Sequence, residues 1–125
     1  MLGVKLVDMS FLKIDERTFK FSLLIIEVYK YLNANKEFVL SKQLLRSGTS
    51  IGANVEEAQA GQSKADFISK MSIASKEARE SKYWIKLLIQ SNYLNGFSKK
   101  DDLINEIDNI VKIITKIIKT SKENV

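Results

Sequence analysis

The sequence predicts an all-α protein, an antiparallel up-down-up-down, left-handed four-helix bundle. Three observations lead to this fold class. The 125-residue chain contains no proline, the residue that most often interrupts a helix. Apolar residues recur at spacings of three and four along four separate segments, as on one face of a helix. The polar breaks between these segments are short, and short turns make consecutive helices antiparallel neighbours.

The first helix is predicted from about Glu16 to Ala34. Six of its residues share one apolar face: Phe21, Leu24, Ile25, Val28, Tyr31 and Leu32. Phe19, Leu23 and Ile26 lie about half a turn away, so this helix presents a second apolar face. A single bundle covers only one face, and we therefore expect the second face to contact another molecule. Residues 1–14 are assigned to an N-terminal arm.

The second helix is predicted from about Phe38 to Ala60, although Ser47 to Gly52 resembles a loop. An apolar stripe continues through that stretch: Leu40, Leu44, Ile51, Val55 and Ala58. Gly48 and Gly52 would let a neighbouring helix approach closely, at a cost of about 1 kcal/mol for each glycine inside a helix. Gly61 is expected to end this helix, and Ser63 to cap the next one.

The third helix has the most regular pattern of the four. Its core positions alternate steps of four and three: Phe67, Met71, Ala74, Ala78, Ser81, Ile85 and Leu88. This alternation is typical of the helix contacts in a left-handed bundle. A mixed stripe flanks the core positions and suggests a second contact: Ile73, Glu77, Glu80, Trp84 and Leu87. The helix is expected to end at Asn95 and Gly96.

The fourth helix is predicted to start at a Ser98 cap. Its core positions are Leu103, Ile107, Ile110, Ile114 and Ile117, and three further apolar residues widen this face: Ile104, Val111 and Ile118. The bundle is assigned to residues 15–122, with a short C-terminal tail at 123–125. A chain of this length can form one core without disulfides or a structural metal.

Composition argues against most kinds of catalysis. The chain contains no cysteine and no histidine, which removes thiol chemistry, the common zinc sites and imidazole acid-base catalysis. The segment Gly48 to Gly52 does not match a phosphate-binding loop, because Ala53 and Asn54 follow where a lysine and a hydroxyl residue are required. We therefore expect no enzyme activity, cofactor, metal or small-molecule substrate.

The glutamates of the two central helices do not suggest a metal centre either. Bundles that bind two iron ions combine glutamates with histidines, and this chain has none of the latter. The chain also lacks an apolar run long enough for a signal sequence or a membrane span, so we expect a cytoplasmic location and no membrane partner.

A structural ion pair is predicted instead between Arg46 and Glu77. If the chain turns at Gly61 and Gln62, position 46 faces position 78, which puts Arg46 beside Glu77. We expect a partly buried pair, and loss of Arg46 would cost on the order of 2 to 4 kcal/mol if the site is dry.

Two exposed basic stripes are candidates for nucleic-acid binding. The first contains Lys76, Arg79 and Lys86 with Tyr83, and the second contains Lys112, Lys116 and Lys119. A solvated helix face is the commoner explanation of such a stripe. Cations interleaved with a tyrosine also suit contact with phosphates and stacking on bases of RNA or DNA, and the formal net charge of +5 permits this attraction.

Two stretches carry a family resemblance: RSGTSIGANVEEA, residues 46–58, and KADFISKMSIASKEARESKYWIKLL, residues 64–88. Together they resemble the four-helix-bundle proteins encoded by intervening sequences in bacterial 23S rRNA genes, and the resemblance covers about residues 19–118. The residues that match are Arg46, Ser50, Ile51, Asn54 and Glu57 in the second helix, and Asp66, Phe67, Ala74, Glu77, Glu80, Tyr83 and Trp84 in the third.

The resemblance implies a left-handed bundle that assembles into a homopentameric ring, with a role in nucleic-acid association and no enzyme activity. A related branch, the accessory variability determinant of diversity-generating retroelements, is a basic pentamer that engages a reverse transcriptase and its template RNA.

Two functions therefore compete. One is an oligomeric module associated with RNA or DNA. The other is a protein-interaction scaffold that recruits a partner such as a reverse transcriptase, with its charge serving only solubility. An enzyme is a distant third. Either way we expect a homo-oligomer, and the candidate interface residues are Phe19, Leu23, Ile26, Ile73, Glu80, Trp84, Leu87, Ile104, Val111 and Ile118.

Overall fold

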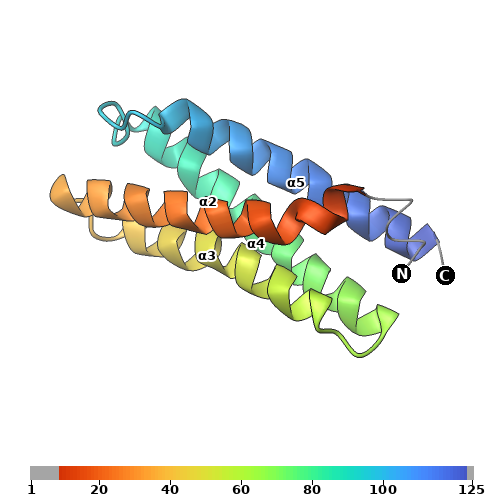
Figure 1. Ribbon diagram of the computed structural model, residues 1–125. Coiled ribbons are helices and arrows are strands. Elements are labelled where there is room, and N and C mark those ends of the chain that lie inside the picture. The colour runs from red at the N-terminus through yellow and green to blue at the C-terminus, as the bar shows by residue number, and fades with distance from the viewer. Residues whose placement is uncertain (1–8, 124–125) are drawn as a thin grey trace.

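The protein is all-α, as the sequence predicts. A computed structural model describes residues 9–123, and within them there are four long helices and no strand. The helices are α2 (Met9–Ala34), α3 (Leu40–Gln59), α4 (Lys64–Gln90) and α5 (Lys100–Glu123) (Figure 1). Among these residues no helix is both long and apolar enough to cross a lipid bilayer.

The four helices pack as a bundle with α2 and α4 at diagonal corners. Helix α2 packs against α3 and α5, and helix α4 packs against the same two helices. Within residues 9–123, α2 and α4 make no close backbone contact with each other, nor do α3 and α5. Figure 1 shows the α2–α3 and α4–α5 connections at one end of the bundle and the α3–α4 connection at the other.

The core consists of the apolar faces that the spacing predicts. Every predicted core position of α5 is buried, and in α4 every one except the half-buried Phe67. Of the predicted core positions in α2 and α3, only Leu24, Tyr31 and Leu40 are less than fully buried. The predicted helical faces are therefore confirmed, with these four residues at the margin of the core.

Helix α2 begins at Met9, about two turns before the predicted start at Glu16. Ile14 is fully buried, and the buried Thr18 donates a hydrogen bond from Oγ1 to the carbonyl of Ile14 at 2.8 Å. These two positions continue the face that contains Phe21, so the start predicted from the sequence was wrong. Of the predicted arm and tail, residues 1–8 and 124–125 lie outside the described residues.

Helix α3 is continuous through its two glycines, which confirms the prediction. A Cβ atom at Gly48 would lie 2.7 Å from Cγ1 of Ile25, and one at Gly52 would lie 3.3 Å from the carbonyl oxygen of Thr18. Both partners belong to α2. The glycines therefore allow α2 and α3 to approach more closely than side chains would permit.

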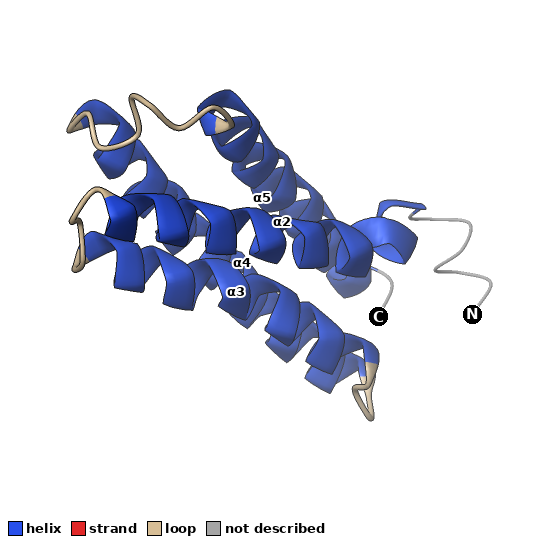
Figure 2. Ribbon diagram, turned by 60° about the vertical axis from the view of Figure 1, so that its left-hand side comes forward, coloured by secondary structure: helices blue, strands red, loops and turns tan. Residues whose placement is uncertain are grey.

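Loops connect the four helices (Figure 2), and specific hydrogen bonds set the ends of two of these helices. Glu37, which is only 7% exposed, accepts backbone N–H bonds from Val39, Leu40 and Ser41 at 3.2, 3.1 and 2.7 Å, and so caps α3. The Oγ atom of Ser63 accepts the backbone N–H of Asp66 at 3.1 Å, which is the predicted cap of α4.

The connection between α4 and α5 is longer than predicted. Helix α4 ends at Gln90 rather than at Asn95, because the chain turns at Asn92 with a positive φ of 69° and then buries Leu94. Helix α5 starts at Lys100, so Lys99 rather than the predicted Ser98 directly precedes it.

Candidate nucleic-acid interface

A groove of about 510 Å³ lies between α4 and α5. Residues of α4 form most of its wall, and α5 contributes one apolar residue. The lining residues are Arg79, Lys82, Tyr83, Lys86, Leu87, Gln90 and Val111. Three of the residues predicted to bind nucleic acid, Arg79, Tyr83 and Lys86, therefore share one concave surface.

The three cations of the groove differ in their partners. Lys82 is neutralised by Asp108, with 2.8 Å between Nζ and Oδ1. Arg79 donates a long hydrogen bond of 3.4 Å from Nη2 to the hydroxyl of Thr115, which leaves its charge uncompensated. Lys86 is exposed, and no carboxylate among residues 9–123 lies within ion-pair distance of it. Arg79 and Lys86 thus supply positive charge to the groove.

Tyr83 gives the groove an aromatic surface. Its side chain is 60% exposed, and its ring meets the ring of Trp84 edge-on, with centroids 5.1 Å apart and an interplanar angle of 71°. Leu87, 38% exposed, adds an apolar surface one turn further along α4. The groove therefore combines uncompensated cations with exposed apolar and aromatic groups.

The other predicted basic residues are exposed but do not line this groove. Lys76 precedes Arg79 on α4, and Lys112, Lys116 and Lys119 lie on α5 beside the single groove residue Val111. Arg79 nevertheless bonds to Thr115, the residue before Lys116, so the two stripes lie on adjoining helices and only the first one lines the groove.

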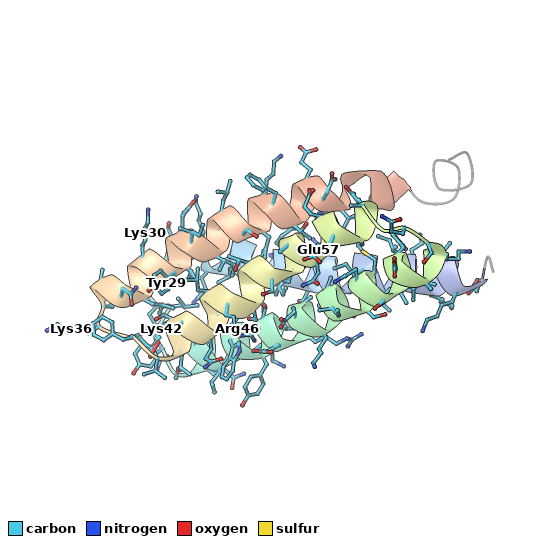
Figure 3. All side chains as sticks on the ribbon, turned by 90° about the horizontal axis from the view of Figure 1, so that it is seen from below. Tyr29, Lys30, Lys36, Lys42, Arg46 and Glu57 are labelled. Carbon is cyan, nitrogen blue, oxygen red and sulfur yellow. The ribbon has the colours of Figure 1, made fainter. Side chains whose placement is uncertain are left out.

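A further basic region surrounds the connection between α2 and α3. Lys30, Lys36 and Lys42 are exposed there (Figure 3), and no carboxylate of the described chain lies within ion-pair distance of them. We did not predict this region because its lysines come from two helices and a turn, and only the fold brings them to one end. The sequence did contain one signal for this region, the short turn between the first two predicted helices, which places Lys36 between Lys30 and Lys42.

Arg46 and Glu77 are in contact, as expected from the position of the turn between α3 and α4. Nη1 of Arg46 lies 3.0 Å from Oε2 of Glu77, and Nη2 bonds to Glu80. Trp84 adds a hydrogen bond of 3.0 Å from Nε1 to Oε2 of Glu80. The network is more open than predicted, since the arginine side chain is 50% exposed and those of Glu77 and Glu80 are 15% and 31% exposed.

These contacts shift the ionisation of the network. The hydrogen bond from Trp84, together with Arg46, holds the pKa of Glu80 below its ordinary value, against an opposing effect of burial. The bonds to Glu80 and Glu77 raise the pKa of Arg46. Glu80, which we assigned to an oligomer interface, is thus engaged within its own chain.

The predicted interface residues divide into two groups. Phe19, Leu23 and Ile26 on α2 are 65%, 51% and 39% exposed, and Ile73 and Leu87 on α4 are 40% and 38% exposed, Leu87 as part of the groove. The second group is packed against the chain's own core and only partly exposed: Trp84, Ile104, Val111 and Ile118. The exposed members of the predicted interface therefore lie on α2 and α4, while Phe38 and Val39 of the α2–α3 connection, which we did not predict, are 54% and 70% exposed.

The described part of the chain does not bring metal-binding donor groups together. Residues 9–123 contain no cluster of three or more carboxylate, histidine or cysteine groups placed to hold an ion. The groove between α4 and α5 is lined by cations, a tyrosine, a glutamine and apolar groups, which suit an anion and not a cation.

Comparison with known proteins gives a family and a structural relative. The family model described as 23S rRNA-intervening sequence protein matches residues 11–116. A solved structure of a protein of unknown function from the S23 ribosomal protein family of Bacteroides thetaiotaomicron is 46% identical, with a TM-score of 0.83 over 89% of this chain and 99% of that one. The comparison with curated proteins finds no match.

Proposed function

Because the chain belongs to the 23S rRNA-intervening sequence protein family, we propose that it is a non-enzymatic, oligomeric module that binds nucleic acid, RNA in particular, in the groove between α4 and α5. One observation carries the proposal. Arg79, Tyr83 and Lys86, three residues singled out for phosphate and base contact, line the same groove. A helix face that is only solvated does not account for an exposed aromatic ring, Tyr83, between the uncompensated cations Arg79 and Lys86.

The energetics favour weak binding by one subunit and stronger binding by an assembly. Phosphate contacts supply most of the non-specific affinity for nucleic acid, because each cation releases condensed counterions. The two uncompensated cations of one groove are too few to give a single subunit high affinity for nucleic acid. Several grooves on one oligomer would act on the same strand and add their affinities through effective concentration.

Salt titration tests this function. We expect the full-length protein to bind a labelled RNA in fluorescence anisotropy at about 50 mM salt, and to lose affinity steeply toward about 200 mM. Arg79→Ala and Lys86→Ala should each reduce the slope of log affinity against log salt by about one. Absence of any RNA binding at low salt would contradict the proposal.

A matched pair of variants tests the location. Lys36→Ala and Lys42→Ala remove exposed charges from the basic region at the α2–α3 connection. They change the net charge by the same amount as the groove variants. If they weaken binding while Arg79→Ala and Lys86→Ala do not, the groove is the wrong site and RNA binds at that end of the bundle.

The exposed face of α2 favours a second candidate function, a protein-interaction scaffold. Phe19, Leu23 and Ile26 form an apolar strip on the side of α2 away from the core. A partner protein, for example a reverse transcriptase, would cover this strip without any direct contact to nucleic acid. The second candidate predicts that RNA enters a complex only when the partner is present.

The placement of α2 and α4 supports self-assembly into a closed ring. The two helices occupy diagonal corners, and each carries exposed apolar residues. A head-to-tail ring joins two different surfaces of each subunit, which this arrangement supplies. We propose five subunits from the family resemblance alone.

Three further expectations belong to the same proposal. Arg17 pairs with Glu106, and Glu27, further along α2, pairs with Lys99, which directly precedes α5. The two chain segments therefore run in opposite directions, and this supports an up-down-up-down order. The left-handed sense of the bundle is a prediction from the spacing of core residues in α4. A cytoplasmic location is proposed from the sequence.

A further inference from the structure

The groove between α4 and α5 presents an exposed aromatic ring to solvent. Tyr83 is 60% exposed, although it lies beside the half-buried Trp84. The edge-on contact of the two rings, 5.1 Å between centroids, restricts the orientation of the tyrosine. A ring that is held in place and still exposed can stack on a planar partner with little loss of conformational entropy.

The cations of the groove lie on both sides of this ring. Arg79 precedes Tyr83 by four residues and Lys86 follows it by three, so all three lie along one side of α4. The axial rise of a helix puts the Cα atoms of Arg79 and Lys86 about 10 Å apart, with Tyr83 at a position between them. Lys82 is less available, because Asp108 lies 2.8 Å from it.

These features distinguish a single strand from a duplex. A base inside a duplex is stacked on both faces and cannot expose one to Tyr83, whereas an unpaired base can turn outward and stack on an aromatic side chain. The volume of about 510 Å³ is that of a small-ligand pocket, and a double helix is too wide to enter it.

We propose that the groove binds an unpaired segment of nucleic acid, with one base stacked on Tyr83 and Leu87 and the flanking phosphates held by Arg79 and Lys86. This inference rests on the proposed function and adds the strand state of the ligand. A duplex would meet only the two cations, and its affinity would not depend on the tyrosine ring.

Two RNA probes and three tyrosine variants test the inference on the full-length protein. The probes are a strand of about ten nucleotides without self-complementarity, within the usual site size for single strands, and the same strand annealed to its complement. We expect Tyr83→Ala to weaken binding of the single strand roughly tenfold and to leave binding of the duplex unchanged. Tyr83→Phe should bind the single strand as the parent does.

Tyr93→Ala is the matched control, because Tyr93 is also exposed, at 44%, but does not line the groove. It should bind both probes as the parent does. Trp84 is the only tryptophan of the chain and touches Tyr83, so its fluorescence should change when the single strand binds. Circular dichroism of each variant verifies that the helices are retained.

The outcomes separate this inference from the proposed function. If Arg79→Ala and Lys86→Ala weaken RNA binding while Tyr83→Ala does not, the groove binds RNA but the stacking proposal is overturned. Equal affinity of the parent for the duplex and the single strand would also overturn it. If neither probe binds at low salt, the proposed function itself fails.

Discussion

Arg46 connects two helices through polar side-chain contacts. It joins α3 to α4 through Glu77 and Glu80, and Glu80 in turn accepts a hydrogen bond from Trp84. Arg46 and Glu77 lie at nearly equal distances along the chain from the turn, which predicted their contact. The contacts of Glu80 with Arg46 and Trp84 depend instead on the directions of the side chains on α4. The network therefore links the register of the two helices to the position of the aromatic pair at the groove.

Replacing Arg46 by alanine should lower the free energy of unfolding by about 1 kcal/mol. The cost of about 2 to 4 kcal/mol expected for a dry pair does not apply, because the arginine side chain is 50% exposed and solvent screens the interaction. Urea denaturation followed by circular dichroism measures the change. Lys42→Ala, one turn earlier on α3, is the control, and an equal effect of both variants would contradict a specific role for the network.

Glu80 should make stability depend on pH in mildly acidic solution. Its pKa in the folded protein is lower than the ordinary glutamate value of 4.5, so the unfolded state binds a proton more readily. The stabilisation that ionised Glu80 provides is therefore complete at pH values above the ordinary glutamate pKa, and it is lost as the pH falls through the lower pKa of the folded state. The raised pKa of Arg46 affects stability only in strongly alkaline solution.

We expect the free energy of unfolding of the parent to decrease more between about pH 5 and pH 3 than that of Glu80→Gln. Denaturant titrations at each pH, followed by circular dichroism, give both curves. Glu56→Gln, which removes an exposed carboxylate from α3, controls for the change in net charge. Parallel curves for the parent and Glu80→Gln would show that the shift in pKa does not contribute to stability.

At the scale of a helix, α3 is the element whose local sequence and tertiary role conflict most. Its stretch Ser47 to Gly52 favours a loop, yet it is helical because α2 packs against the glycines. The buried hydrogen bond of 2.8 Å between Ser81 and Ser47 holds the other side of the same stretch against α4. Tertiary packing thus outweighs the low helix propensity of glycine and serine.

Gly48→Ala should destabilise the protein, although alanine is the better helix former. The new Cβ would lie 2.7 Å from Cγ1 and 2.8 Å from Cδ1 of the fully buried Ile25. We expect a net loss of roughly 1 to 3 kcal/mol, because overpacking exceeds the gain of about 1 kcal/mol in propensity. Chemical denaturation measures the loss.

A double-mutant cycle tests the cause. In an Ile25→Ala background the clash is absent, so Gly48→Ala should be neutral or stabilising. Gly52→Ala is the matched single control, because its nearest neighbour would be 3.3 Å away and a smaller loss is expected. An equal loss from Gly48→Ala in both backgrounds would contradict the packing explanation.

At the scale of the whole molecule, the exposed apolar residues are the basis of the proposed self-assembly. Ile104, Val111 and Ile118 cover the bundle's own core, so they leave less free surface than we expected. Phe19, Leu23 and Ile26 form the largest exposed strip among the predicted interface residues. Proteins that stay monomeric seldom expose such a strip, and assembly would cover it.

We expect light scattering at micromolar concentration to report about five times the mass of the 14.2 kDa chain. Leu23→Glu should dissociate the assembly, because a carboxylate would be buried against an apolar surface without a partner. Trp84 is a poorer probe, since it is partly buried and bonded to Glu80 within the chain.

Gln43→Glu adds the same charge at an exposed position of α3 and should leave the mass unchanged. Circular dichroism of both variants controls for folding. A monomeric parent at that concentration would contradict self-assembly, and the α2 strip would then have to be assigned to another protein.

The sequence predicted three residues of the candidate groove, but it did not show which neighbouring cations are neutralised or lie outside the groove. The interleaving of Arg79, Tyr83 and Lys86 was visible in the sequence, because residues spaced by three and four share a helix face. That Lys82 is neutralised by Asp108, and that Lys112, Lys116 and Lys119 lie outside the groove, depends on how α4 and α5 are rotated against each other. Rotation is set by packing across the bundle, which a pattern within one helix does not contain.

The four helices and their buried faces follow from the local pattern of the chain, because helical periodicity is a local property and burial follows apolar spacing. Packing between helices decides where α2 begins and where α4 ends, and it places α2 and α4 at diagonal corners. These features depend on contacts between residues distant in the chain. The free energy that selects them arises only when the helices pack together.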